Sequence, residues 1–157
     1  SLLKEIFEEA QDRNCLCPTH FIDLAFVNQC LGNNQQCEAF LRAGLSEFPN
    51  DASILVELGG FLIAQGYPDE AYETLHNAVK FSPQNIQAVA SLCILYYYQG
   101  DKLRFHEYAR RLLPLPPQTS LDHYIIGRVL YLQGNQEEAS GHFLQSKGEV
   151  GPYYDEL

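Results

Sequence analysis

The chain has 157 residues, of which 46% are hydrophobic and 19% charged, and its formal net charge is −10. These values are typical of a folded chain, large enough for one domain or a run of small repeats. The acidic surplus argues against nucleic acid as a partner, because phosphate binding needs an excess of lysine and arginine, and it also disfavours anionic membrane surfaces. No apolar run reaches the roughly 18 residues of a membrane span, so we expect no membrane insertion.

The first predicted element lies within residues 1–17, in the stretch "LLKEIFEEAQ". Leu3, Phe7 and Ala10 fall on one side of a helix there. We therefore predict an N-terminal helix, either the second helix of a partial repeat or a cap. The chain contains no methionine, so we expect Ser1 not to be a native start and the chain to be cut from a longer protein.

Two residue types then recur with a period of 34. Each glycine of the series ends an apolar run and is followed by a polar turn, which is typical of a helix C-terminus that needs positive φ. Each proline lies where the next helix must stop, because proline lacks the N–H and clashes with the preceding turn. The series are Gly32, Gly66, Gly100, Gly134 and Pro49, Pro83, Pro117.

The pattern between these markers predicts helix, tight turn, helix, four times over. Asp51, Ser82 and Ser120 lie at or near the helix starts, where their side chains cap well. The predicted divisions are 18–51, 52–85, 86–119 and 120–153, all in one solenoid domain. Residues 154–157 remain as a tail or the start of a further helix.

Small residues recur where the two helices of a pair should cross. The eighth residue of each repeat is Ala25, Gly59, Cys93 or Gly127, and the twentieth is Cys37, Ala71, Phe105 or Ala139. Small side chains at both positions let two helices approach closely. Phe105 departs from this rule, so we expect the third pair to be splayed or repacked.

With these residues in register, the sequence resembles the tetratricopeptide repeat family over residues 18–153. The second repeat, "ELGGFLIAQGYPDEAYETLHNAVKFSP", matches the family pattern best, although the usual tryptophan at position four is replaced in every repeat. The resemblance implies an all-α solenoid, a right-handed superhelix of antiparallel helix pairs. The matching residues are Leu58, Gly59, Gly66, Ala71, Ala78 and Pro83.

The sequence contains none of the catalytic motifs that we searched for. There is no phosphate-cradling glycine loop, no G-x-S-x-G and no H-E-x-x-H, and the five histidines are scattered over different repeats. We expect no catalytic residues, no metal and no cofactor, and therefore no enzyme. Five cysteines without metal-binding spacing are interpreted as reduced thiols, which favours a cytoplasmic protein.

In the tetratricopeptide repeat family, which the sequence resembles, the first helix of each repeat lines a concave groove. The positions that would line it here are apolar and aromatic, and an exposed stripe of that kind usually marks an interaction site. We predict that a protein or peptide segment with apolar or aromatic anchors binds there. The predicted groove residues are Ile22, Phe26, Val56, Ile63, Ile94, Tyr97, Tyr98, Tyr124, Arg128 and Tyr131.

The family's carboxylate clamp for heat-shock chaperone tails is not expected. It needs lysine and asparagine where this chain has Ile22 and Phe26, or Val56 and Gly60. The neighbouring Tyr96 is predicted to pack against its own hairpin partner instead of lining the groove.

Three alternatives stay open at this stage. The stripe could be covered by the chain itself or by a second copy. The protein could be an assembly or secretion chaperone that dimerises, or the non-catalytic repeat region of a larger enzyme.

The basic residues near 102–111 are interpreted as a solvated face, with an acidic partner on the convex side as the other interpretation. The proline-rich stretch at 112–119 is interpreted as a turn.

Overall fold

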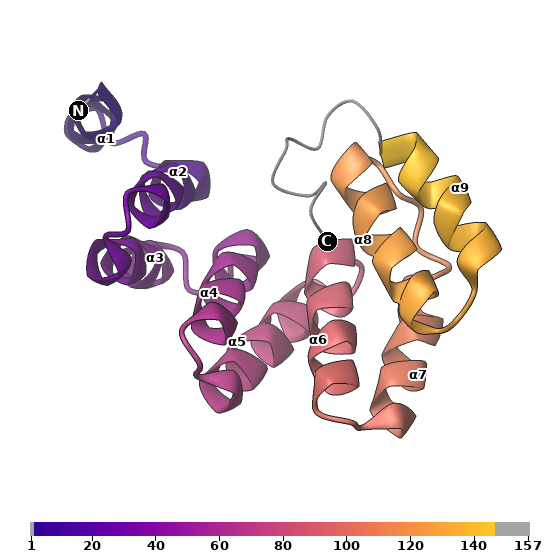
Figure 1. Ribbon diagram of the computed structural model, residues 1–157. Helices are drawn as coiled ribbons and strands as arrows, with labels where there is room; N and C mark the ends of the chain where they lie inside the picture. The colour runs from indigo at the N-terminus through magenta and orange to yellow at the C-terminus, as the bar shows by residue number, and fades with distance from the viewer. Residues whose placement is uncertain (1, 147–157) are drawn as a thin grey trace. The chain divides into compact units, whose positions relative to one another are not determined.

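A computed structural model describes residues 2–146, with side chains described from Lys4 onward. Within these residues every regular element is an α-helix. Figure 1 follows them along the chain. The helices are α1 (Leu2–Asp12), α2 (Pro18–Cys30), α3 (Asn34–Glu47), α4 (Ala52–Ala64), α5 (Pro68–Phe81), α6 (Ile86–Tyr98), α7 (Lys102–Leu112), α8 (Ser120–Leu132) and α9 (Gln136–Ser146).

After α1 the helices form four pairs, α2–α3, α4–α5, α6–α7 and α8–α9, and each helix packs chiefly on its partner. The first helices of the pairs begin at Pro18, Ala52, Ile86 and Ser120, so their starts are 34 residues apart. The prediction of an all-α repeat of helical pairs is confirmed. The predicted end of the fourth repeat and the tail at 154–157 lie outside the described residues.

The four glycines of the periodic series all adopt the left-handed backbone predicted for them. Their φ angles lie between 75° at Gly32 and 86° at Gly134. Each glycine N–H donates to the carbonyl three residues earlier, and the next N–H donates to the carbonyl five residues before it. At each turn these paired bonds satisfy two of the last carbonyls of the first helix.

The predicted proline stops are confirmed for two helices and wrong for a third. Helices α3 and α5 end at Glu47 and Phe81, two residues before Pro49 and Pro83. Helix α7 ends at Leu112, five residues before Pro117, so the prediction that Pro117 ends it is wrong. Pro114 intervenes first, because it has no N–H to donate to a carbonyl of the last turn.

The N-termini depend on the residue immediately before each helix. The Asp51 carboxylate accepts a hydrogen bond from the Ile54 N–H at 3.0 Å, as its predicted capping role requires. At α6 the cap is Asn85 and not Ser82, which lies too far upstream to reach the first turn. At α8 it is Thr119 and not Ser120, because Ser120 already has helical backbone.

Contacts between residues divide the chain into two units, which are described separately. Unit 1 extends to Phe81 and contains α1–α5, and unit 2 begins at Ser82 and contains α6–α9. In unit 1 the aromatic ring of Phe7 packs edge-on against Phe21, with the ring centroids 5.1 Å apart. This contact joins α1 to α2. The central core of unit 1 comprises Ala25, Cys37, Leu41, Ile54, Leu58, Phe61, Leu62 and Ala71.

In unit 2 the third pair is repacked around Phe105. Its ring is buried and contacts the ring of Tyr97 at a centroid distance of 5.3 Å. Beside it the rings of Tyr96 and Tyr108 lie 5.3 Å apart, and the Cys93 thiol donates to the Phe105 carbonyl at 3.4 Å. An aromatic layer therefore replaces the small-residue contact found in the other pairs.

Candidate functional site

The predicted groove residues lie on the first helices of the four pairs, four of them in unit 1 and six in unit 2. We call these the first face (Ile22, Phe26, Val56 and Ile63, on α2 and α4) and the second face (Ile94, Tyr97, Tyr98, Tyr124, Arg128 and Tyr131, on α6 and α8). Within each unit the two helices pack against each other. All ten side chains are at least partly exposed.

The first face is aliphatic apart from one ring. Phe26 is 62% exposed and Ile63 is 43% exposed. Ile22 and Val56 are half-buried, and Ile22 also packs against the core of unit 1. This face therefore offers a few scattered apolar contacts over a well-packed interior.

The second face presents three large rings to solvent. Tyr98 is 70% exposed, Tyr131 58% and Tyr97 42%. Tyr97 is held from two sides, because its ring packs edge-on against Tyr98 at 5.6 Å and against the buried Phe105 at 5.3 Å. A tyrosine fixed in this way loses little side-chain entropy when a partner covers it.

The adjacent tyrosines of α6 separate as the helical register requires. Tyr96 is only 2% exposed and packs on Tyr108 of α7, so its predicted packing role is confirmed. Tyr97 and Tyr98 point elsewhere because successive side chains on a helix are about 100° apart.

The α8 members of the second face differ among themselves. Tyr124 is half-buried and its ring lies 6.0 Å from that of Phe143, so it leans toward α9. Arg128 is half-buried and forms no ion pair with any carboxylate in the described part of the chain. Tyr131 remains open, one turn beyond Arg128.

Sequence reasoning missed polar and open positions beside these residues. Asp23 and Glu57 are exposed on α2 and α4, on the same sides as Phe26 and Gly60. A Cβ added to Gly60 would meet nothing within 4 Å. Positions 53, 57, 60 and 64 of α4 are three or four residues apart, so their shared side of the helix could have been predicted from the sequence.

Neither metal-binding nor membrane-spanning features appear in the described residues. No group of three or more histidine, cysteine, aspartate or glutamate side chains is arranged to hold a metal ion there. No described helix is long and apolar enough to cross a membrane. The five cysteines are free thiols, and burial raises the pKa of Cys93 to about 12.

One histidine pair does come together across α8 and α9. The Nδ1 atoms of His123 and His142 are 3.1 Å apart, a distance at which one ring donates to the other. Burial, and then the nearby His123, lower the pKa of His142, while Glu138 acts in the opposite direction.

Comparison with solved structures decides the type of repeat. The chain superposes on the crystal structure of TTC0263, a thermophilic tetratricopeptide repeat protein of Thermus thermophilus, with a TM-score of 0.67 and 17% identity. That match covers 90% of this chain and 78% of the other. The fold is a tetratricopeptide-repeat fold.

Other solved structures agree at the level of the fold. A structure of MamA matches with a TM-score of 0.58 and 15% identity, covering 89% of this chain and 82% of that one. A chain of the APC/C hetero-tetramer Cut9–Hcn1 matches with a TM-score of 0.68 and 15% identity, over 92% of this chain and 28% of that one.

Sequence comparison is less informative than structure. No family model matches the chain. The uncharacterized protein y4yS of Sinorhizobium fredii (strain NBRC 101917 / NGR234) is 26% identical over 112 residues, which is 71% of this chain. The matched region spans 61% of the length of that relative.

Proposed function

We propose that the chain is a non-enzymatic protein-interaction module that binds a segment of a partner protein on the second face. The observation that carries the proposal is the exposure of Tyr97, Tyr98 and Tyr131 on two neighbouring first helices. The rings of Tyr97 and Tyr98 contact each other, and α6 packs against α8, which carries Tyr131; contiguous exposed apolar patches usually mark interaction sites. Tyrosine is also among the residues that dominate binding energy at protein interfaces.

The proposed partner segment has apolar or aromatic anchors and one acidic residue. The anchors would pack against the tyrosine rings, and each tyrosine would contribute about 2 kcal/mol if it acts as a hot spot. The acidic residue would meet Arg128, whose guanidinium has no described carboxylate partner.

Two further points support an interaction role. A structurally similar chain belongs to the hetero-tetramer Cut9–Hcn1, so this fold occurs in a complex of two proteins. Within the chain, the buried Phe105 packs against the ring of Tyr97. This contact restricts the Tyr97 side chain before binding, which reduces the entropic cost of binding.

The test uses segments of about 12 to 20 residues selected for binding from a displayed random library. Their affinities are measured for the native chain and for the double variant Tyr97→Ala with Tyr131→Ala. We expect at least a tenfold loss of affinity in the double variant, with helicity by circular dichroism nearly unchanged.

A matched control removes two exposed side chains elsewhere, Tyr67→Ala with Leu144→Ala, which are 59% and 64% exposed. We expect these to leave the affinity within twofold. Equal affinities for the native chain and the tyrosine variant would refute the proposal. Sedimentation equilibrium adds a second outcome: a native dimer made monomeric by the tyrosine variant would mean that a second copy occupies the face.

A further inference from the structure

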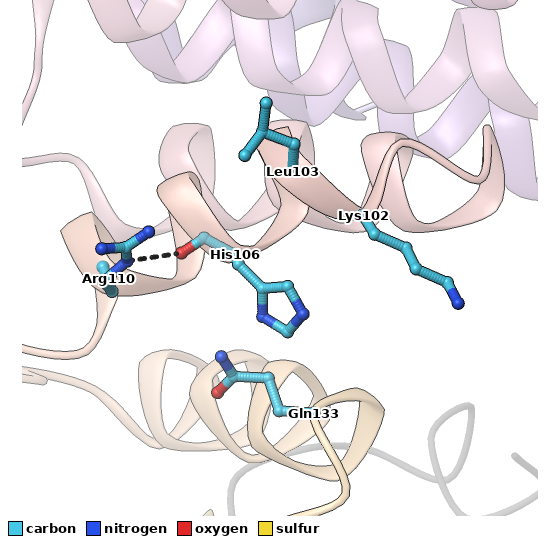
Figure 2. Close-up of a pocket in the computed structure, with 5 residues that line it drawn as sticks. All are labelled: Lys102, Leu103, His106, Arg110 and Gln133. Carbon is cyan, nitrogen blue, oxygen red and sulfur yellow. Dashed lines mark hydrogen bonds between the residues drawn. The ribbon is translucent and has the colours of Figure 1, made fainter.

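A recessed surface lies along α7, and none of the tyrosines of the second face lines it. It is a shallow, open depression with a volume of about 550 Å³. Figure 2 shows its lining, in which the His106 ring is directed toward Gln133 while Lys102 and Arg110 lie toward opposite ends of α7. We call this hollow, lined by Lys102, Leu103, His106, Arg110 and Gln133, the basic pocket.

The sequence spacing explains why its basic groups gather. Lys102, His106 and Arg110 are four residues apart in succession, so they lie along one side of the helix. Gln133 comes from the end of α8, in the same unit, and adds an amide to the opposite wall. The pocket thus combines two permanent cations, an imidazole and an amide, with no acidic residue in its lining.

The charges in the pocket are not neutralised by the described part of the chain. Neither Lys102 nor Arg110 forms an ion pair with a described carboxylate, and the Arg110 Nε donates only to the His106 backbone carbonyl, at 3.4 Å. This is notable in a chain whose formal net charge is −10, where acidic residues outnumber basic ones by two to one.

The other two cations of α7 show the contrast. Arg104 pairs with Asp101 at 3.7 Å and lies over the ring of Tyr96, 5.5 Å from its centroid. Arg111 lies over the ring of Tyr108 at 4.8 Å. One helix therefore has two arginines engaged by its own unit, and a lysine and an arginine left for an external anion.

We infer that the basic pocket binds an acidic segment of a protein, through carboxylates that contact Lys102 and Arg110. Carboxylates accept charge-assisted hydrogen bonds from both groups, and the Gln133 amide and the His106 ring add donors between them. The distance along α7 from Lys102 to Arg110, about 12 Å at 1.5 Å per residue, favours several carboxylates on an extended chain over one small anion. This inference is independent of the second face, since none of its residues lies there.

The test is a nuclear magnetic resonance titration of the full chain with a blocked five-residue peptide of alternating aspartate and glutamate. We expect weak, salt-sensitive binding, because exposed charge pairs are individually weak and screened. The shifts should centre on the backbone amides of Lys102, Leu103, His106 and Arg110 and on the Gln133 side-chain amide. The same peptide with asparagine and glutamine should cause no such shifts.

Two double variants remove the same two charges from the same helix. Lys102→Gln with Arg110→Gln should weaken binding by about tenfold, whereas Arg104→Gln with Arg111→Gln should change it less than twofold. Equal weakening by both pairs would show a response to overall charge and would overturn the assignment. It would also be overturned if inorganic phosphate shifted the same signals as strongly as the peptide, since that identifies a phosphate site.

Discussion

The second and third helical pairs solve the same packing problem with different residues. In the α4–α5 pair, Gly59 lets Leu75 approach so closely that an added Cβ would lie 2.5 Å from the Leu75 Cδ2. In the α6–α7 pair, Cys93 faces a segment that contains the buried Phe105, and aromatic rings fill the space. The first arrangement closes a pair by removing a side chain, and the second closes it by adding a large one.

The difference also affects the outer surface. Around Gly59 the contact is complete inside the pair, and the neighbouring Gly60 faces open space. Around Phe105 the aromatic layer extends outward to Tyr97, which is 42% exposed. The departure from the small-residue rule therefore joins the core of the third pair to the proposed binding face.

The largest expected effect comes from removing the aromatic layer. Phe105→Ala should lower the free energy of unfolding of unit 2 by about 3 kcal/mol, because it leaves a cavity in place of a buried ring. Urea denaturation followed by circular dichroism measures this. Leu103→Ala, which removes a side chain 78% exposed on the same helix, should have little effect, and equal losses in the two variants would contradict the role given to Phe105.

Filling the glycine contact should be the next most damaging change. Gly59→Leu should cost about 1 to 3 kcal/mol of stability by overpacking against Leu75, which is fully buried. Gly60→Leu is its matched control, one residue along, and should be neutral or slightly stabilising, because leucine favours helix over glycine. Equal melting temperatures for the two variants would show that the close contact at Gly59 does not limit the packing.

The two interior cysteines allow each unit to be followed separately. Cys37 is buried in unit 1 and Cys93 in unit 2, and burial raises the pKa of both thiols. The exposed Cys15 and Cys30 should react with a thiol reagent within minutes at about pH 8, while the interior pair should react only as their units open.

This labelling assay separates the effects of the two substitutions above. Gly59→Leu should speed the labelling of Cys37 more than that of Cys93, and Phe105→Ala should do the reverse. Peptide mapping by mass spectrometry assigns the sites. If either substitution accelerated both thiols equally, the two units would unfold together and not independently.

The smallest expected effect concerns pH and the pair His123–His142. The pKa of His142 is lowered from its ordinary value of 6.5, so the folded state binds fewer protons than the unfolded state. The stability from this group is present above pH 6.5 and is lost as the pH falls through the folded-state pKa. The free energy of unfolding of the His142→Asn variant should therefore fall less than that of the native chain between about pH 7.5 and 5.5. Plots of unfolding free energy against pH that run parallel for the two proteins would contradict this.

The repeat and its turns could be predicted because they depend on backbone chemistry that single residues reveal. Glycine at positive φ and proline without an N–H restrict the chain wherever they occur, so their spacing of 34 defined four pairs. The caps at α6 and α8 were displaced by one to three residues, since several polar residues near a helix start compete to be the cap. Pro117 failed as a stop because Pro114 precedes it.

The sites were harder to predict, since they depend on which side chains the fold brings together. The exposure of Phe26, Tyr98 and Tyr131 is consistent with their register, yet the lean of Tyr124 toward Phe143 comes from packing that no spacing reveals. The basic pocket needs Gln133, 23 residues beyond Arg110, and the histidine pair joins residues 19 apart. Only the packing within unit 2 brings these groups together.

The glycine turns have a consequence for how such a surface could be diversified. In all four pairs the glycine N–H holds the carbonyl of the residue three places earlier, at 2.9 to 3.1 Å. Those residues are Gln29, Ile63, Tyr97 and Tyr131. Because the hydrogen bond involves only backbone atoms, an amide, an aliphatic and two aromatic side chains occupy equivalent places with the same local backbone. Each such place is a position at which one substitution can change the side chain on the proposed interaction surface without changing the backbone turn beside it.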